Sequence, residues 1–510
     1  MNIGNRFLEF SELQEFIRHT SKVELEEVAL NHLDTNFQFL LDFSRDKIIY
    51  GLNTGFGPMA KVKISQADQI SLQYNLIRSH ASGSGDILPC FYVKTVMLAR
   101  LNSLMRGYSG INRSVVELLR DFINYEIYPV IFSHGGVGAS GDLVQLSHLA
   151  LALIGEGDVI FRDKIVSTRK AMDICGLNPI EIKSREGLAL INGTSCMTGI
   201  GLINTMYANH LLNWITLASA ILNEIMESYD DYFSEALNGV KYHIGQQKVA
   251  KSISNILHQS NLIKNRSLNN FKTAPGSTDD KVQEYYSLRC VPQIVGAILE
   301  TIDHCQNTLV NEFNSANDNP IVDSERREVF HGGNFHGDYI SFEMDKLRLA
   351  ITKLSMLSER QLNFLLNDSL NQKLPPFVNL GIPGLNLGMQ GAQFTATSTT
   401  AENQALSTSM YIHSIPNNRD NQDIVSMGTN AALFTKKVIE NTFEIMAIEY
   451  ITILQAIDYL KIENKLSPVS AKWYHELRNL VPVFSDDTSK YQEIRNMTDF
   501  LSNNSPAVIA

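Results

Sequence analysis

A glycine-rich loop contains the residues of this sequence that most directly suggest chemistry. It reads SHGGVGASGDL over residues 133–143 and sets Ser140 between Ala139 and Gly141. A phosphate-binding P-loop requires a Lys-Ser or Lys-Thr pair after its last glycine, and Asp142 stands there instead. The nucleophile elbow of hydrolases requires G-x-S-x-G, and the segment GASGD lacks the second glycine in register. The spacing alone leaves two interpretations: an ordinary turn that leads into a helix from Asp142 through Leu153, or a loop with catalytic chemistry of its own.

A second polar segment, HGGNFH, carries His331 and His336. No third histidine or carboxylate accompanies them at the spacing of metal ligands, and the H-E-x-x-H pattern is missing. We therefore expect no catalytic metal, and structural or polar roles for these two histidines.

Composition bounds the class of protein. The chain has 510 residues, of which 44% are hydrophobic and 19% charged, and its net charge of −11 with no basic run argues against nucleic-acid binding. No run approaches the roughly 18 apolar residues of a membrane span, and the amino terminus lacks the pattern of a secretory signal. Five scattered cysteines without a CxxC pair suit a reduced, cytoplasmic protein.

The elements that must position these residues differ between the two halves of the chain. Residues 50–200 hold short glycine clusters, whereas no Gly or Pro interrupts the segment from Asn430 to Leu466, about 37 residues or ~55 Å of helix. Apolar residues at helical spacing over 295–313 indicate another long helix, and 203–228 and 339–367 read similarly. We expect loops over 263–282 and 367–395 and a frayed, polar end after Pro482. The prediction is a mainly α fold with a domain over 1–200 and a long-helix domain over 201–510.

Eight motifs in this order resemble the histidine, phenylalanine and tyrosine ammonia-lyase family. They run from about residue 10 to 480, and the resemblance is closest to the bacterial tyrosine ammonia-lyase subgroup with Arg-Ser-His in its selectivity segment. The motifs are YGLNTGFGPM, LQYNLIRSHASG, GGVGASGDLVQLSHLALALIGEG, EGLALINGTS, YYSLRCVPQ, SANDNP, HGGNFHGDY and DNQDIVSMG. The resemblance implies a long-helix bundle of the aspartase/fumarase-like type, with the cofactor-bearing loop in the amino-terminal half.

The resemblance also implies a cofactor built from the chain itself. Gly141 N would attack the Ala139 carbonyl and two waters would leave, giving 4-methylidene-imidazole-5-one (MIO). Serine supplies the β-hydroxyl whose loss leaves a methylidene, an electrophile that no standard side chain offers.

Further site residues follow from the matching motifs. Tyr50 corresponds to a catalytic tyrosine on a mobile lid that removes the substrate β-proton, although a phenol with a pKa of about 10 is a poor base unless its surroundings favour the phenolate. Arg289 would clamp the substrate carboxylate with its two-pronged donor, assisted by Asn319. The remaining members are Tyr286, pointing a hydroxyl into the site, Asn192, bonding the MIO carbonyl or the substrate amine, and Phe335, packing against MIO.

The substrate is predicted from two positions. Ser79 and His80 occupy the segment expected to face the substrate ring, a pair that the resemblance associates with both histidine lyases and the tyrosine-specific subgroup. Histidine lyases carry a glutamate where this chain has Gln422, and a neutral amide suits a neutral aryl ring. We favour tyrosine as the substrate, with histidine next, followed by phenylalanine or a 2,3-aminomutase reaction that uses the same MIO.

The resemblance implies a homotetramer in which three chains build each site. Residues 139–141 and Asn192 would come from one chain, and Tyr50 and Arg289 from its neighbours. A non-catalytic scaffold would have lost Ser140, Tyr50 or Arg289, all of which are present, and the GSSxMPxKxN-like loop of fumarase-type lyases is missing.

Overall fold

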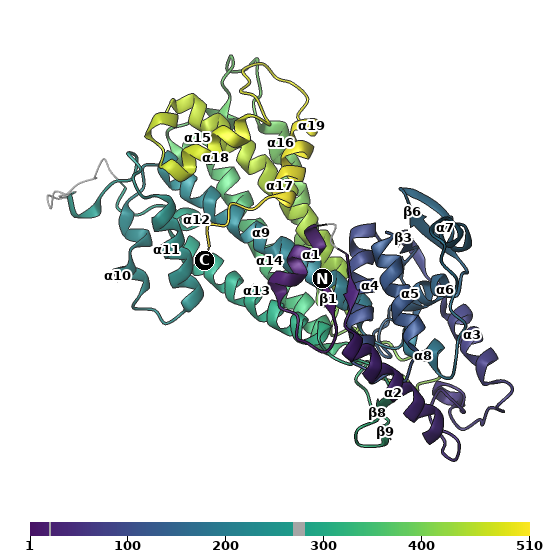
Figure 1. Cartoon of the computed structure of the whole chain (residues 1–510). Coiled ribbons are helices and arrows are strands. Elements are labelled where there is room, and N and C mark those ends of the chain that lie inside the picture. The colour runs from purple at the N-terminus through teal and green to yellow at the C-terminus, as the bar shows by residue number, and fades with distance from the viewer. Residues whose placement is uncertain (20–21, 269–280, 510) are drawn as a thin grey trace. The chain divides into compact units, whose positions relative to one another are not determined.

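The computed structural model describes residues 1–19, 22–268 and 281–509, and the chain is mainly α-helical, as predicted (Figure 1). Each helix of this described part is either too short or too polar to span a lipid bilayer. Four helices are much longer than the others: α9 (Ser195–Ile225), α13 (Val291–Phe313), α14 (Asp338–Leu366) and α17 (Gly428–Leu460).

The chain divides into two compact units. Unit 1 comprises Met1–Asn204, Cys305–Asp345 and Ser409–Lys436, and unit 2 comprises Thr205–His304, Lys346–Thr408 and Lys437–Ala510. This division differs from the boundary expected after residue 200, because each of the four long helices contributes residues to both units. The change in composition near residue 200 indicates where long helices begin, and not which segments pack together.

Unit 1 contains the shorter helices of the amino-terminal half and every strand found among the described residues. The helices are α1 (Phe10–Arg18), α2 (Glu27–Phe43), α3 (Gln69–His80), α4 (Cys90–Met105), α5 (Arg113–Asn124), α6 (Leu143–Leu153), α7 (Thr168–Cys175) and α8 (Glu186–Ile191). The strands form small sheets: β1 (Asn2–Ile3) pairs parallel with β2 (Glu24–Leu25), and the antiparallel pairs are β3 (Ser84–Ile87) with β5 (Phe132–His134), β4 (Tyr128–Pro129) with β6 (Asp158–Phe161), β6 with β7 (Lys164–Ser167), and β8 (Ile321–Asp323) with β9 (Glu328–Phe330). Helices α3, α6 and α8 contact one another. This three-helix contact brings the LQYNLIRSH, GASGD and EGLALIN motifs close together.

Unit 2 is built around buried aromatic side chains. Trp214 is fully buried, and its ring meets those of Trp473 and Tyr450 edge-on, with centroids 4.9 and 5.4 Å away. Besides its parts of the long helices, the unit contains α10 (Glu235–Asn238), α11 (Ile244–Ile256), α12 (Tyr286–Arg289), α15 (Asp368–Asn371), α16 (Gln390–Leu406), α18 (Pro468–Arg478) and α19 (Tyr491–Asn503).

The long-helix predictions are confirmed, whereas two loop predictions need correction. Segment 367–395 holds the short helix α15 and the start of α16, and the end of the chain forms α19 instead of fraying. Met497 and Leu501 of α19 are fully buried, and Phe500 lies 6.2 Å from Trp214 between ring centroids. These spaced apolar residues give a mostly polar segment one buried face, which is enough to hold it as a helix. Part of the expected loop over 263–282, residues 269–280, lies outside the described residues.

Candidate active site

The segment Ala139–Gly141 lies between β5 and α6. Gly141 has a φ of +70°, and a Cβ atom there would collide with the backbone of Gly193. The next residue, Asp142, donates its N–H to the Gly193 carbonyl at 2.8 Å. Position 141 therefore requires glycine both for its left-handed backbone and for this close approach.

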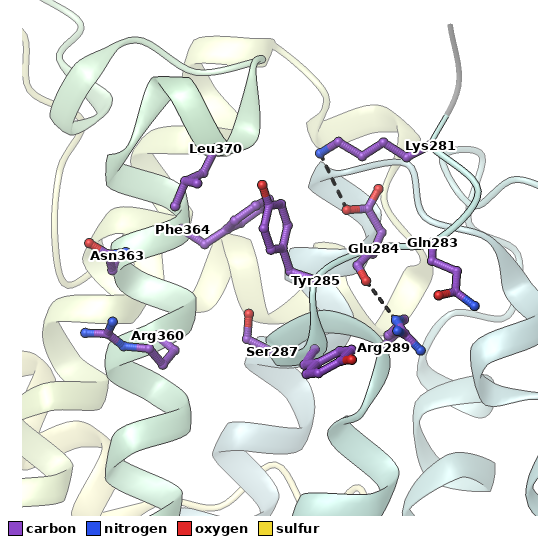
Figure 2. A pocket seen from close by; sticks show the side chains of 11 residues that line it. Lys281, Gln283, Glu284, Tyr285, Ser287, Arg289, Arg360, Asn363, Phe364 and Leu370 are labelled. Carbon is purple, nitrogen blue, oxygen red and sulfur yellow. Dashed lines mark hydrogen bonds and ion pairs between the residues drawn. The ribbon is translucent and has the colours of Figure 1, made fainter. Parts of the chain in front are cut away.

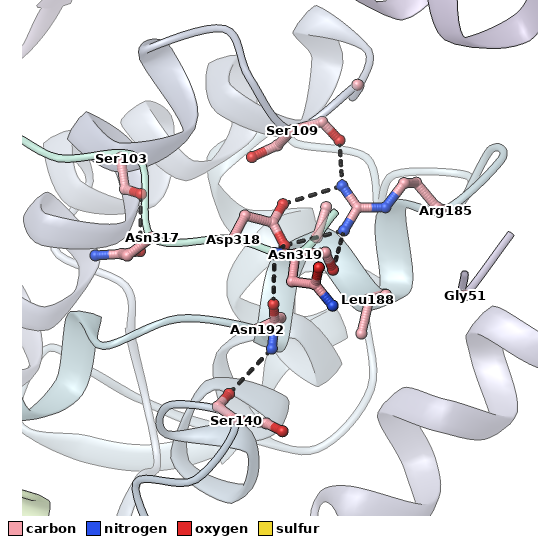
Figure 3. A network of polar contacts seen from close by, with 12 residues as sticks. Gly51, Ser103, Ser109, Ser140, Arg185, Leu188, Asn192, Asn317, Asp318 and Asn319 are labelled. Carbon is pink, nitrogen blue, oxygen red and sulfur yellow. Dashed lines mark hydrogen bonds and ion pairs between the residues drawn. The ribbon is translucent and has the colours of Figure 1, made fainter. Parts of the chain in front are cut away.

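Two amide side chains hold Ser140. Asn192 Nδ2 donates to the Ser140 carbonyl at 3.1 Å (Figure 3), and Gln422 Nε2 donates to the Ser140 hydroxyl oxygen at 2.9 Å. Asn192 follows the last residue of α8 and is only 3% exposed, so its orientation is fixed by its surroundings. Both polar groups of Ser140 are thereby oriented by residues predicted for the site.

Asp142 anchors the same loop to helix α9. Its carboxylate accepts the N–H groups of Cys196 and Met197 in the first turn of α9 at 2.8 and 2.9 Å, and the Thr429 hydroxyl at 2.5 Å. Burial raises the pKa of Asp142 to about 6, although these three hydrogen bonds oppose the rise. A helix amino terminus stabilises negative charge, which makes this a favourable place for a buried carboxylate.

Tyr50 lies in the cavity of the same chain that contains Ser140. Its Oη accepts the Gly57 N–H at 3.0 Å, its own N–H donates to His331 Nε2 at 3.3 Å, and its ring meets Phe56 edge-on. The expectation that Tyr50 comes from a neighbouring chain is wrong, because one chain brings it together with Ser140. A sequence motif identifies a site residue without showing which subunit supplies it.

His80 is the last residue of α3 and lines the cavity, whereas Ser79 does not. Ser79 is exposed and donates its hydroxyl to the Leu76 carbonyl at 3.1 Å, because a serine near a helix end bonds the preceding turn. His80 Nδ1 lies 3.0 Å from the same carbonyl, which can only accept a hydrogen bond. Nδ1 also lies 3.0 Å from the Ser79 hydroxyl oxygen, which can donate to it, so these contacts allow the hydrogen on either ring nitrogen. With the hydrogen on Nδ1, Nε2 is an acceptor.

These side chains surround a cavity of about 370 Å³ in unit 1. Of the predicted residues it brings together Tyr50, His80, Ala139, Ser140, Asn192, Asn319, Phe335 and Gln422. Its other lining residues are Phe56, Gly57, Ala60, Leu76, Leu143, Leu188, His336, Asn418, Asn421, Asp423 and Ile424. Apolar walls with several neutral amides suit a small aromatic molecule that also carries polar groups.

Tyr286 and Arg289 line a different cavity, of about 690 Å³, in unit 2 (Figure 2). Arg289 Nε donates to the Glu284 carbonyl at 2.8 Å, and its guanidinium carbon lies 4.7 Å from the centroid of the Tyr286 ring. Tyr286 is 71% exposed. The structure therefore does not bring these two predicted residues into the cavity that contains Ser140.

The two histidines of HGGNFH make ordinary polar contacts. His331 accepts the Tyr50 N–H, and His336 lines the cavity with Nδ1 2.8 Å from Asp338 Oδ2. Among the described residues, no group of three or more His, Cys, Asp or Glu side chains is arranged to hold a metal ion.

Sequence reasoning missed three charged residues around the site. Asp142 was considered only as a mismatch to two loop motifs, and the buried pair of Arg185 and Asp318 was not considered (Figure 3). Each lies in or beside a quoted motif: Asp142 in GASGD, Asp318 in SANDNP, and Arg185 directly before EGLALINGTS. Charged residues in or directly beside the matching motifs were the available signal, since such residues are rarely buried without a partner.

A family model described as aromatic amino acid lyase matches residues 8–479. This chain belongs to the aromatic amino acid lyase family. A tyrosine 2,3-aminomutase of Chondromyces crocatus is 40% identical over 461 residues, which cover 89% of this chain and 87% of that protein. A histidine ammonia-lyase of Geobacillus sp. (strain WCH70) is 39% identical over 454 residues, covering 89% and 87%. The solved phenylalanine aminomutase of Pantoea agglomerans matches with a TM-score of 0.95 at 31% identity, covering 100% of this chain and 99% of that one.

Membership makes this chain an enzyme of the ammonia-lyase and aminomutase class that acts on aromatic amino acids, and the family uses MIO. The residues at the Ala-Ser-Gly segment fit this group. Ring closure joins residue 141 to residue 139 and requires a residue without a side chain at 141, which the crowding at Gly193 also demands. The amides of Asn192 and Gln422 lie against the two oxygens of Ser140, one of which the cyclisation would remove as water.

Proposed function

We propose that this enzyme is a carbon–nitrogen lyase that removes ammonia from L-tyrosine to give trans-p-coumarate, with MIO formed from Ala139, Ser140 and Gly141. One observation carries the proposal: a single cavity combines Tyr50 and Ser140 with His80 and the neutral Gln422. MIO supplies the electrophile that makes the substrate amino group a better leaving group. The side chains of the chain itself must then bind the substrate and move its β-proton.

Tyr50 is proposed as the base that removes the β-proton. Its hydroxyl oxygen accepts the Gly57 N–H at 3.0 Å, and a backbone donor in this position stabilises negative charge on that oxygen. Phe56 packs edge-on against its ring with centroids 6.2 Å apart, which limits where the ring can point. Asn192, bonded to the Ser140 carbonyl, is proposed to orient the cofactor, and Phe335 to cover it.

His80 and Gln422 support tyrosine as the substrate. In the tautomer whose Nδ1 hydrogen is donated to the Leu76 carbonyl, His80 Nε2 is an acceptor for a phenolic O–H. Gln422 presents an uncharged amide at the position where histidine lyases carry a carboxylate. A site built to bond a hydroxyl discriminates against phenylalanine, which leaves the buried acceptor unpaired.

We propose that the substrate carboxylate is bound by Asn319 and by Arg289, with Tyr286 beside it. Asn319 lines the cavity of Ser140, whereas Arg289 and Tyr286 line the separate cavity of unit 2. The proposal therefore includes a homotetramer in which a neighbouring subunit supplies Arg289 and Tyr286 to each site. Tyr50 belongs to the chain that carries Ser140.

Two other reactions have specific support. The relative from Chondromyces crocatus is named a tyrosine 2,3-aminomutase, which points to the same substrate with a different product. The relative from Geobacillus is named a histidine ammonia-lyase, which points to a different substrate with the same reaction. The residues of the cavity favour tyrosine over histidine through Gln422.

The test is incubation of the pure enzyme with L-tyrosine, L-histidine and L-phenylalanine in separate reactions. Ultraviolet absorbance detects the conjugated acids, and chiral chromatography detects β-tyrosine. The proposal predicts p-coumarate as the main product and tyrosine as the substrate with the highest kcat/KM. Predominant β-tyrosine would replace the lyase with the aminomutase, and a clear preference for histidine would overturn the substrate assignment.

A further inference from the structure

A buried ion pair lies directly behind the cavity of Ser140. The side chains of Arg185 and Asp318 are 0% and 1% exposed. Arg185 Nη1 and Nη2 donate to the two carboxylate oxygens of Asp318 at 3.0 and 2.9 Å, and Nη1 also donates to the Ser109 carbonyl at 2.6 Å (Figure 3). Buried ion pairs contribute little net stability, because desolvation offsets their attraction. A pair of this geometry is better explained by what it holds in place.

The pair forms hydrogen bonds to both the carbonyl and the N–H group of Asn319. Arg185 Nη2 donates to the Asn319 carbonyl at 3.0 Å. The Asn319 N–H donates to Asp318 Oδ1 at 2.7 Å and to Asn192 Oδ1 at 2.8 Å. The same Asn192 bonds Ser140 through its other amide atom, so the network runs without a gap from Arg185 to the cofactor-forming serine (Figure 3).

The side chain of Asn319 is oriented as well. The Gly332 N–H donates to its Oδ1 at 2.8 Å, and only the oxygen of the amide can accept this bond. The remaining atom, Nδ2, makes no hydrogen bond to any residue the structure describes, and Asn319 lines the cavity. The network therefore leaves the NH2 group of Asn319 as a donor at the cavity.

We propose that Arg185, acting through Asp318, is a positioning residue that fixes the Asn319 amide as a donor to the substrate carboxylate. This inference rests on the proposed function, in which Asn319 binds that carboxylate. Arginine is required because its planar fork contacts both oxygens of Asp318 and two backbone carbonyls at once. A lysine ammonium at this position carries the same charge without that geometry.

The first experiment measures carboxylate recognition by Arg185→Lys, Asn319→Ala and the double variant. Loss of a hydrogen bond to a charged group costs roughly 10–10²-fold in binding, so Arg185→Lys should raise KM by up to that factor while kcat changes less. If Arg185 acts through Asn319, the rise in KM of the double variant should be no larger than that of Asn319→Ala alone. A double variant whose rise in KM is the product of the two single effects would overturn the proposal.

A second readout uses ligands that are not turned over. Inhibition by trans-p-coumarate should weaken in Arg185→Lys, whereas inhibition by its uncharged amide should stay within about two-fold of wild type. Equal weakening of both ligands would assign Arg185 a purely structural role. If Asn319→Ala binds p-coumarate as wild type does, the inference fails, while p-coumarate formation by the wild type separately tests the proposed function.

Two further variants control for folding. Arg478 of unit 2 makes a similar set of contacts, to Asp458, to Gln455 and to the Val481 carbonyl, and Arg478→Lys should lose stability without selective loss of carboxylate binding. If Arg185→Lys yields too little folded protein, Asp318→Glu keeps the charge pair while displacing Asn319, and it should give the same selective rise in KM. An unchanged KM in a folded Asp318→Glu enzyme would contradict the proposal.

Discussion

Replacement of Tyr50 by phenylalanine should distinguish the role of its hydroxyl as a base from the role of its ring in packing. The substitution removes one oxygen, which accepts the Gly57 N–H at 3.0 Å, and keeps the ring that packs edge-on against Phe56. Tyr50 makes no hydrogen bond to Ala139, Ser140 or Gly141 among the bonds of the described residues, so cofactor formation should proceed. The cofactor-forming segment should therefore be the same in both proteins.

The expected losses differ greatly in size. Gly57 is partly exposed, so water can replace the lost acceptor, and the stability cost should be that of one hydrogen bond, about 0.5–1.5 kcal/mol. Removal of a general base typically costs about 10²–10⁴-fold in rate, which corresponds to about 2.7–5.5 kcal/mol in the activation barrier. The activity loss should therefore exceed anything explained by instability.

The assay is kcat on L-tyrosine together with thermal unfolding and intact mass. The matched control is Phe56→Leu, which removes the neighbouring ring and leaves the Tyr50 hydroxyl. It should change kcat by less than about ten-fold, because the Tyr50 ring becomes less well positioned but keeps its hydroxyl. A Tyr50→Phe enzyme with kcat near that of wild type would refute the reasoning, because another residue would then be taking the proton.

Further predictions concern specificity, pH and assembly. His80→Phe should remove a hydrogen bond to tyrosine worth about 0.5–1.5 kcal/mol and shift the preference in kcat/KM toward phenylalanine. Gln422→Glu should lower kcat/KM for tyrosine. An unchanged ranking of the amino acids in both variants would contradict the roles assigned to these residues. Burial raises the pKa of Glu449 from 4.5 to about 8, so its stabilising contribution is complete below pH 4.5 and is lost as pH rises through 8. Unfolding titrations should show Glu449→Gln losing less stability over that range, by up to about 1.4 kcal/mol per pH unit, and parallel profiles would argue against a buried protonated carboxyl. Light scattering should give about four times the 57.1 kDa chain mass, and an active monomer would exclude sites shared between subunits.

The long helices were predictable because their signal is local. Segment 430–466 lacks Gly and Pro, and the observed α17 occupies most of it. The two compact units were not predictable in this way, since segments 305–345 and 409–436 join unit 1 through contacts with residues more than a hundred positions away. Helix α19 was missed because its few apolar residues are meaningful only beside the aromatic core around Trp214.

The candidate site shows the same limit. Motif order identified eight of the residues that line the cavity, including Gln422, which lies 282 positions after Ser140 and bonds to it. The sequence did not reveal that Tyr50 and Ser140 of one chain line the same cavity. It also did not reveal that Asp142 anchors the loop to the start of α9. Burial and hydrogen-bond partners decide such roles, and both arise only when distant segments meet.

The most direct test of the central proposal is the intact mass of the purified protein. Cyclisation of Ala139, Ser140 and Gly141 with loss of two waters predicts a mass about 36 Da below that of the sequence. Ser140→Ala has no serine hydroxyl to lose as water, so its mass should not show the full deficit. It should have no lyase activity and should retain the helical content of the wild type. A fully active wild-type sample at the unmodified mass would contradict the account.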